Sequence, residues 1–260
     1  MKIPIYQVDA FTSRVFGGNP AAVCPLESWL ADATLQAIAA ENNLSETAFL
    51  VGRDGKYDIR WMTPVAEVDL CGHATLASGW VVFNRLETGR GDVEFGSRSG
   101  PLKVVREGDL LALDFPARPP EAVGDARAVG EALGRPPRQL LAARDYLALY
   151  DSEEEVRALR PDMARVAALD RHAVIASAPG RDCDFVSRFF APGLGVPEDP
   201  VTGSSHCTLV PYWAARLGKD RLSARQVSAR GGELFCEQRG ARVRIAGRAV
   251  LFLEGRIEIS

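Results

Sequence analysis

The sequence has neither a long apolar run nor a basic cluster. No hydrophobic segment approaches the roughly 18 residues that a membrane-spanning helix needs, and the N-terminus enters a strand-like pattern with no secretion signal. The 31 lysines and arginines are dispersed among 34 acidic residues, and the net charge is −3. The sequence therefore offers no footprint for nucleic acid or an anionic membrane, and we expect a cytoplasmic protein.

Cysteine and histidine are scarce, and neither forms a familiar metal or redox motif. The five cysteines are odd in number, scattered and without a CxxC pair, so reduced thiols are expected rather than a disulfide framework. Four residues in two short motifs have the chemistry of zinc ligands: Cys71, His73, His206 and Cys207. Their spacing, CxH and an adjacent HC, matches none of the usual zinc patterns, so we predict no metal site.

Nucleotide-binding motifs are also missing. The sequence contains neither GxGxxG nor GxxxxGK[ST], which would cradle phosphate groups at the start of a helix. GxSxG, the nucleophile turn of α/β-hydrolases, is absent as well. We therefore predict a protein that works without a cofactor and is not a serine hydrolase.

The chain does contain two similar stretches, each with glycine and small polar residues ahead of an apolar run with helical spacing. A separation of 133 residues (206 − 73) aligns them, pairing His73 with His206 and Trp80 with Trp213. Each stretch is typical of a loop leading into a helix N-terminus, where free N–H groups and the helix dipole favour an anion. Two such helix starts in one chain indicate a paired site.

The similarity extends to the elements around these stretches. Arg60 and Arg188 lie in similar strands 128 residues apart, and the order of strand pair, loop, helix and further strands occurs twice. A duplicated α+β unit explains this pattern most simply. Equivalent loops would then converge on a cleft between the halves, where small-molecule sites form.

At 260 residues, the chain is long enough for two halves of about 130 residues each. We expect a division into 1–118 and 119–260, with the strand near 250–260 a candidate to pack with the N-terminal half. The proline-rich segment 116–138 is the best candidate linker. Helices are expected at 32–41, 73–86, 153–159, 163–169 and 204–217.

The two loops differ in chemistry, and function should lie in that difference. His73 of the first loop titrates near neutral pH and can accept or donate a proton. Asp199 of the second loop could do so only in a special environment. The backbone N–H groups of Gly203 and Ser204 could instead hold a substrate carboxylate or an enolate.

Outside the loops, Glu46 stands at the start of an otherwise apolar strand, where burial would favour its protonated form and suit it to acid–base catalysis. Every candidate also has a structural interpretation. A carboxylate at a strand end can be solvated, a histidine at a helix start can bond the backbone, and an aspartate before proline is a common turn residue. Cys71 and the His206–Cys207 pair can simply pack in the core.

Taken together and in order, these motifs resemble the phenazine-biosynthesis isomerase family, the PhzF-like proteins, which share the diaminopimelate epimerase fold. The similarity covers nearly the whole chain. The matching motifs are 8–11 (VDAF), 18–23 (GNPAAV), 44–49 (LSETAF), 71–75 (CGHAT) and 198–204 (EDPVTGS).

The resemblance implies an α+β fold of two pseudo-symmetric halves, each a curved, barrel-like sheet around a central helix. It implies that Glu46 is the principal acid and base and works with His73 and Asp199 in the inter-domain cleft. It places four further residues at the substrate: Asn19, Gly72, Gly203 and Ser204. It also implies cofactor-free isomerisation of a small anionic metabolite, and a possible homodimer.

Related epimerases use two opposed cysteines, one on each loop. Here Cys71 is kept, whereas we expect Asp199 to stand where the second cysteine would be, so a two-thiol mechanism is not expected. The hypothesis is proton transfer at a carbon of a small carboxylate-bearing metabolite. The alternative is a module that binds a small anionic metabolite without chemistry.

Overall fold

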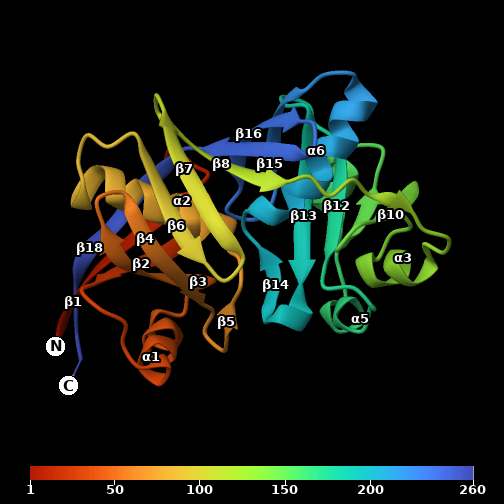
Figure 1. The fold of residues 1–260 in the computed structure, drawn as a ribbon. Coiled ribbons are helices and arrows are strands. Elements are labelled where there is room, and N and C mark those ends of the chain that lie inside the picture. The colour runs from red at the N-terminus through yellow and green to blue at the C-terminus, as the bar shows by residue number, and fades with distance from the viewer. Residues whose placement is uncertain (260) are drawn as a thin grey trace. The chain divides into compact units, whose positions relative to one another are not determined.

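The computed structural model describes residues 1–259 and has the α+β architecture expected from the sequence (Figure 1). The chain forms two compact units, which we describe separately. Unit 1 contains Met1–Asp114 and the C-terminal segment from Ala246, and unit 2 contains Phe115–Ile245. Unit 1 is therefore assembled from both ends of the chain.

Unit 1 is a curved sheet wrapped around one helix. Parallel pairings of β2 with β3 and of β4 with β6 interrupt antiparallel ladders, and β1 lies between β2 and β18. The strands are β1 (Lys2–Ala10), β2 (Asn19–Leu26), β3 (Glu46–Arg53), β4 (Lys56–Met62), β5 (Glu67–Val68), β6 (Asp92–Ser97), β7 (Gly100–Glu107), β8 (Leu110–Pro116) and β18 (Ala249–Glu258). Helix α1 (Asp32–Asn42) packs on β3 and β4.

Helix α2 (Gly72–Val81) is the centre of unit 1 and contacts β1, β2, β3 and β7 (Figure 1). Almost all of its residues are buried, because small side chains let the sheet approach closely from several sides. Its buried hydroxyl groups are satisfied inside the helix: Ser78 Oγ donates to the Ala74 carbonyl at 2.7 Å. A short π-helical turn (Val82–Leu86) continues the helix, so the helix expected over 73–86 is correct in position.

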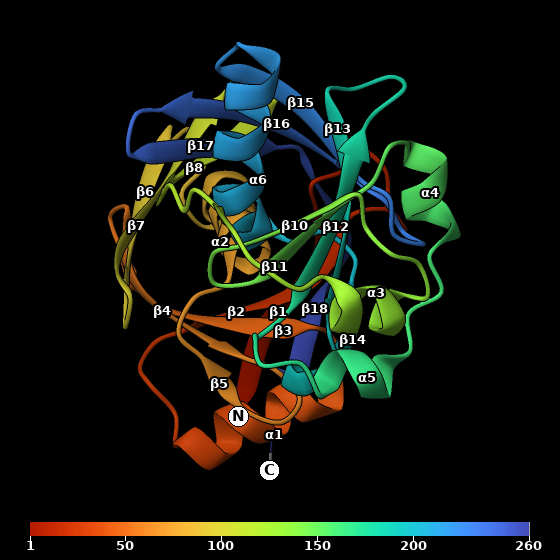
Figure 2. The ribbon, with the colours of Figure 1, turned by 90° about the vertical axis from the view of Figure 1, so that its right-hand side faces the viewer.

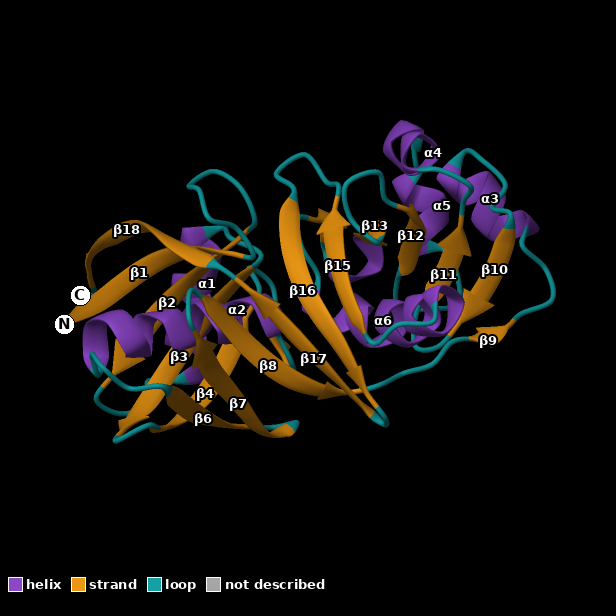
Figure 3. Cartoon of the chain, turned by 90° about the horizontal axis from the view of Figure 1, so that it is seen from above, coloured by secondary structure: helices purple, strands orange, loops and turns teal. Residues whose placement is uncertain are grey.

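Unit 2 repeats this plan around α6 (Gly203–Leu217), which packs on β15 and β16 (Figure 3). Its strands are β9 (Glu121–Ala122), β10 (Gln139–Ala142), β11 (Tyr146–Leu149), β12 (Val174–Pro179), β13 (Phe185–Ala191), β14 (Val196–Asp199), β15 (Arg221–Gln226), β16 (Gly232–Arg239) and β17 (Arg242–Gly247). In the buried core, Trp213 of α6 stacks on Phe185 of β13 and donates its indole N–H to Ser177 Oγ at 3.0 Å.

Three short helices distinguish unit 2 from unit 1. These are α3 (Arg127–Leu133), α4 (Glu153–Ala158) and α5 (Met163–Ala167), which lie beside β12 and β13 (Figure 2). Val129 and Leu133 of α3 are buried in the same apolar cluster as Phe190 of β13. The linker expected over 116–138 is therefore wrong, because its proline spacing hid a strand and a packed helix.

Strand registers show the internal repeat residue by residue. In unit 1, Ala22 pairs with Thr47, and Thr47 pairs with Met62. In unit 2, the corresponding row is Tyr146, Val174 and Phe190, again with one parallel and one antiparallel pairing. The duplication inferred from short sequence similarities is thus present in the hydrogen-bonding pattern of both sheets.

Among the residues described, no helix combines the length and the apolar character that crossing a bilayer requires.

Candidate active site

The candidate site of unit 1 begins where two parallel strands start side by side. Glu46 is the first residue of β3 and pairs with Ala21 of β2, two residues after Asn19, which opens β2. Asn19 is completely buried, whereas 15% of the Glu46 side chain is exposed. Pairing of the two strands therefore places an amide and a carboxylate at one end of the sheet.

His73 lies between these two side chains. It is the second residue of α2, whose N-cap is Cys71 in an extended conformation. Its Nε2 atom is 3.2 Å from Glu46 Oε2, and its Nδ1 atom is 3.1 Å from Asn19 Nδ2. Cys71 Sγ is 3.5 Å from the same Nδ1 atom.

Burial sets the protonation of this histidine. Only 4% of the residue is exposed, and burial lowers the pKa of His73 to about 3, since a buried imidazolium loses its hydration. His73 is therefore neutral at physiological pH. A neutral imidazole has one donor nitrogen and one acceptor nitrogen, so its neighbours decide which is which.

Glu46, Cys71 and His73 are the one group of potential metal ligands within residues 1–259. The carboxylate, however, approaches Nε2, whereas the thiol approaches Nδ1. One ion can bind only one nitrogen of a ring, so the three groups cannot hold it together without turning the imidazole. The arrangement suits a proton relay better than a metal.

In unit 2, the second loop connects β14 to α6. Asp199 ends β14, and its carboxylate accepts a hydrogen bond from the Thr202 hydroxyl. Gln226, which is 1% exposed, holds this loop with its amide. Its Nε2 donates to the Asp199 carbonyl at 2.7 Å, and its Oε1 accepts from the Thr202 N–H at 2.8 Å.

An ion pair fixes the alignment of the two loops. In each unit, an arginine forms a bidentate pair with the glutamate of the short strand before the loop: Arg60 with Glu67, and Arg188 with Glu198. From these glutamates to the first residues of α2 and α6, Gly72 and Gly203, the offset is constantly 131 residues (198 − 67 and 203 − 72).

Two sequence-based expectations are corrected by this alignment. The offset of 133 residues, which paired His73 with His206, is wrong at the helix starts, where the partner of His73 is Ser204. Thr202, as the N-cap, takes the position of Cys71, so the expectation that Asp199 stands there is also wrong. The second thiol is missing in either alignment.

His206 and Cys207 lie inside unit 2, as their structural interpretation predicted. His206 Nδ1 is 2.8 Å from the Thr202 carbonyl, and its ring packs against Phe185. Burial lowers the pKa of His206 to about 4 and raises the pKa of the Cys207 thiol to about 11. Neither residue is placed for acid–base work near neutral pH.

The predicted residues thus fall into two groups. Asn19, Glu46 and His73 meet in unit 1, with Gly72 opening α2 beside them. The other group, Asp199, Gly203 and Ser204, spans the end of β14 and the start of α6 in unit 2.

Sequence reasoning missed Gln226 and Arg144. Arg144 lies at 3.2 Å from the buried Asp145 and reaches Ser204 Oγ at 3.4 Å. Neither residue belongs to a motif, and both act across long sequence separations, so no local pattern marks them.

Comparison with known proteins decides the family. The model of the family described as phenazine biosynthesis-like protein matches residues 8–255. The chain belongs to the phenazine biosynthesis-like family. A Pseudomonas aeruginosa protein named as an uncharacterized isomerase is 54% identical to it over 259 residues, covering 100% of each chain. We therefore classify this family member as an isomerase.

Solved structures agree with this placement. The chain is similar to a crystal structure of a PhzF family protein from Enterococcus faecalis, with a TM-score of 0.97, 47% identity and 100% of each chain covered. A hydroxyproline epimerase from Agrobacterium vitis has a TM-score of 0.63 at 12% identity, covering 98% of this chain and 91% of that one. This distant similarity shows the shared epimerase-like fold alone.

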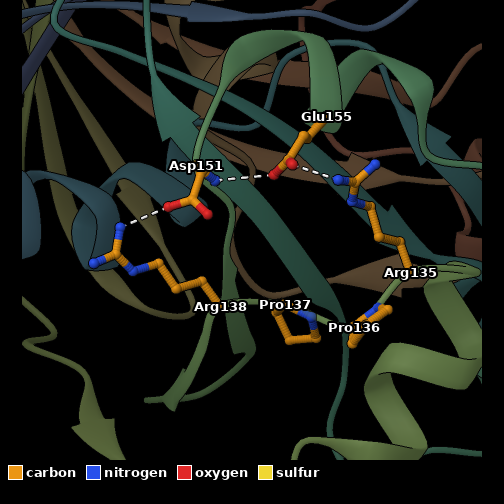
Figure 4. Close-up of a pocket in the computed structure, with 6 residues that line it drawn as sticks. All are labelled: Arg135, Pro136, Pro137, Arg138, Asp151 and Glu155. Carbon is orange, nitrogen blue, oxygen red and sulfur yellow. Dashed lines mark hydrogen bonds and ion pairs between the residues drawn. The ribbon is translucent and has the colours of Figure 1, made fainter.

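A surface hollow of about 460 Å³ elsewhere in this family member has no comparable chemistry (Figure 4). Arg138 pairs with Asp151 at 2.6 Å, and Arg135 pairs with Glu155. Each cation on its rim is therefore matched by an anion, and little charge remains to attract a ligand.

Proposed function

We propose that this phenazine biosynthesis-like protein is a cofactor-independent isomerase that moves a proton at a carbon of a small carboxylate-bearing metabolite. The observation that supports it best is the contact of 3.2 Å between His73 Nε2 and Glu46 Oε2 at the start of a buried helix. A carboxylate held by a neutral imidazole is a suitable base for a carbon-bound proton.

In the proposed reaction, Glu46 removes the proton from one carbon of the substrate and returns it to another. The electron pair of the broken C–H bond remains on the substrate as an enolate or extended carbanion. The N-terminus of α2, which begins at Gly72, stabilises this negative charge. His73 keeps the carboxylate oriented throughout.

Asp199 is proposed as the third member of the acid–base set. Its carboxylate accepts a hydrogen bond from Thr202, and Gln226 holds its backbone, so the side chain is oriented by unit 2. Gly203 and Ser204 would contribute backbone N–H groups and a hydroxyl to bind the substrate carboxylate.

Hydrogen exchange tests this function directly. Small carboxylates with an acidic carbon-bound hydrogen are incubated with the protein in D₂O, and ¹H NMR follows loss of the carbon-bound signal. We expect one structural class to exchange and isomerise, and Glu46→Gln to slow both by about 10²-fold or more.

Full exchange by a folded Glu46→Gln variant would remove Glu46 from the reaction. A compound that binds with no exchange in the wild type would instead support the alternative, a binding module without chemistry. Glu67→Gln is the matched control, because Glu67 is equally buried but pairs with Arg60 and lies outside the proposed chemistry.

A further inference from the structure

The environment of His73 Nδ1 carries information that the acid–base assignment does not use. Asn19 is completely buried, in a position where an amide that made no specific contact would be costly. Its Nδ2 atom faces His73 Nδ1 at 3.1 Å, and the Cys71 thiol, a weak donor, lies at 3.5 Å from the same atom. Both groups can donate a hydrogen bond to Nδ1.

On the opposite side of the ring, the carboxylate of Glu46 is 3.2 Å from Nε2. An ionised carboxylate only accepts hydrogen bonds. A neutral ring with Nδ1 as acceptor must carry its proton on Nε2, and this proton then points at Glu46. The two ends of the ring therefore require the same tautomer.

From this geometry we infer that Asn19 is a positioning residue, which holds His73 as the Nε2–H tautomer and so keeps Glu46 ionised as the resting base. Asn19 acts through His73 and does not need to touch the substrate. The inference rests on the proposed function only for its consequence in catalysis, because the tautomer is a property of the protein alone.

The internal repeat provides an independent argument. In unit 1, β2 begins at Asn19, three residues before Ala22, whereas β11, its counterpart in unit 2, begins at Tyr146, the partner of Ala22 in the repeat. Within the described chain, unit 2 therefore has no strand residue at the position of Asn19.

The other members of the cluster are replaced as well. The row of Thr47 and Val174 aligns Glu46 with Ala173, and the helix starts align His73 with Ser204. The amide, the carboxylate and the imidazole thus occur together in one unit and are lost together in the other. Fold requirements common to both sheets do not explain Asn19, whereas a joint role with Glu46 and His73 does.

The tautomer can be measured on the full-length protein without any substrate. The chain has only three histidines, so ¹⁵N-histidine labelling gives a sparse two-bond ¹H–¹⁵N spectrum, and His172→Gln and His206→Gln assign the signals by elimination. For the wild type near pH 7, we expect His73 to show an unprotonated Nδ1 and a protonated Nε2. A protonated Nδ1 would overturn the inference, and this outcome needs no variant to fold.

Asn19→Asp then tests the role of the amide. The substitution keeps the shape but replaces the donor at Nδ1 with a carboxylate oxygen, so we expect Nδ1 to become protonated. With any compound that the wild type exchanges in D₂O, the rate should fall by about 10²-fold. A folded Asn19→Asp protein that keeps the wild-type tautomer would contradict the positioning role.

Asn84→Asp is the control, because Asn84 bonds the Trp80 carbonyl and Arg106 rather than His73. It should leave both the His73 signals and the exchange rate unchanged. If the tautomer is as inferred but no compound exchanges, the proposed function fails and the assignment of Asn19 stands. A change of tautomer in Asn84→Asp would show a general response to added charge and would count against Asn19.

Discussion

Two buried histidines show how the same residue type serves different purposes. His73 contacts Glu46 through Nε2, whereas His206 is 2.8 Å from the Thr202 carbonyl through Nδ1. Both are at helix starts and both are kept neutral by burial. Only the first has a carboxylate beside it, so residue type and location by themselves do not identify the reactive group.

The buried histidines make stability depend on pH. Burial lowers the pKa of His206 to about 4, below its ordinary value of 6.5, so between these values the unfolded chain binds more protons than the folded protein. The stability contribution is therefore full above about pH 6.5 and falls as the pH drops towards 4, with a slope of about 1.4 kcal/mol per pH unit for this group. His73 adds to the effect.

Urea unfolding at several pH values between 4.5 and 7 measures this slope. We expect His206→Gln to reduce it by about 1.4 kcal/mol per pH unit, whereas His172→Gln, which removes the remaining histidine, should leave it unchanged. Equal slopes for the wild type and His206→Gln would show that His206 titrates normally in the folded state.

Helix α2 illustrates how an element is fitted to its surroundings. Gly79 faces β7, and a Cβ atom at this position would lie 2.7 Å from Val104 Cγ1. Glycine weakens an isolated helix by about 1 kcal/mol relative to alanine, but here it allows the helix to contact the sheet. Close packing of α2 keeps the site-bearing first turn in place.

Gly79→Ala should therefore destabilise the protein by about 1–3 kcal/mol through overpacking, despite the better helix propensity of alanine. In Val104→Ala the obstacle is removed, so the double variant should lose about 1 kcal/mol less than the sum of the two single variants. Chemical denaturation provides all four values. Gly124→Ala, with no atom within 4 Å of the new Cβ, is the control and should change stability little.

At the scale of the whole molecule, unit 1 depends on both ends of the chain. Strand β18 pairs with β1 along nearly its full length, and the N-terminal amine donates to the Ile259 carbonyl. Many side chains of β18 are exposed, so its contribution comes mainly from backbone hydrogen bonds to β1.

Ending the chain before Ala249 should expose one edge of β1 and loosen the buried side chains Ile3, Ile5 and Val8. We expect hydrogen–deuterium exchange, followed by mass spectrometry, to show loss of amide protection that is greatest in unit 1. Leu253→Lys is the control, because it keeps the backbone ladder and changes a side chain that is 42% exposed. Unchanged protection of β1 in the truncated protein would contradict this account.

Much of the fold could be predicted from the sequence, because apolar periodicity and turn residues are local signals. Helix α1, expected at 32–41, spans Asp32–Asn42, and the helix expected at 204–217 begins one residue earlier, at Gly203. The short strands β5, β9, β10 and β14 and helix α3 were missed, because two to seven residues contain too little periodicity to detect.

The sequence by itself determined the duplication, the family resemblance and the residue types of an acid–base site, because these depend on the order of residues along the chain. Only the tertiary structure decided that Asn19 faces His73 rather than solvent, that Thr202 and not Asp199 matches Cys71, and that Gln226 holds the second loop. These contacts join residues 24 to 54 positions apart, and strand pairing and helix packing, which no local pattern records, bring them together.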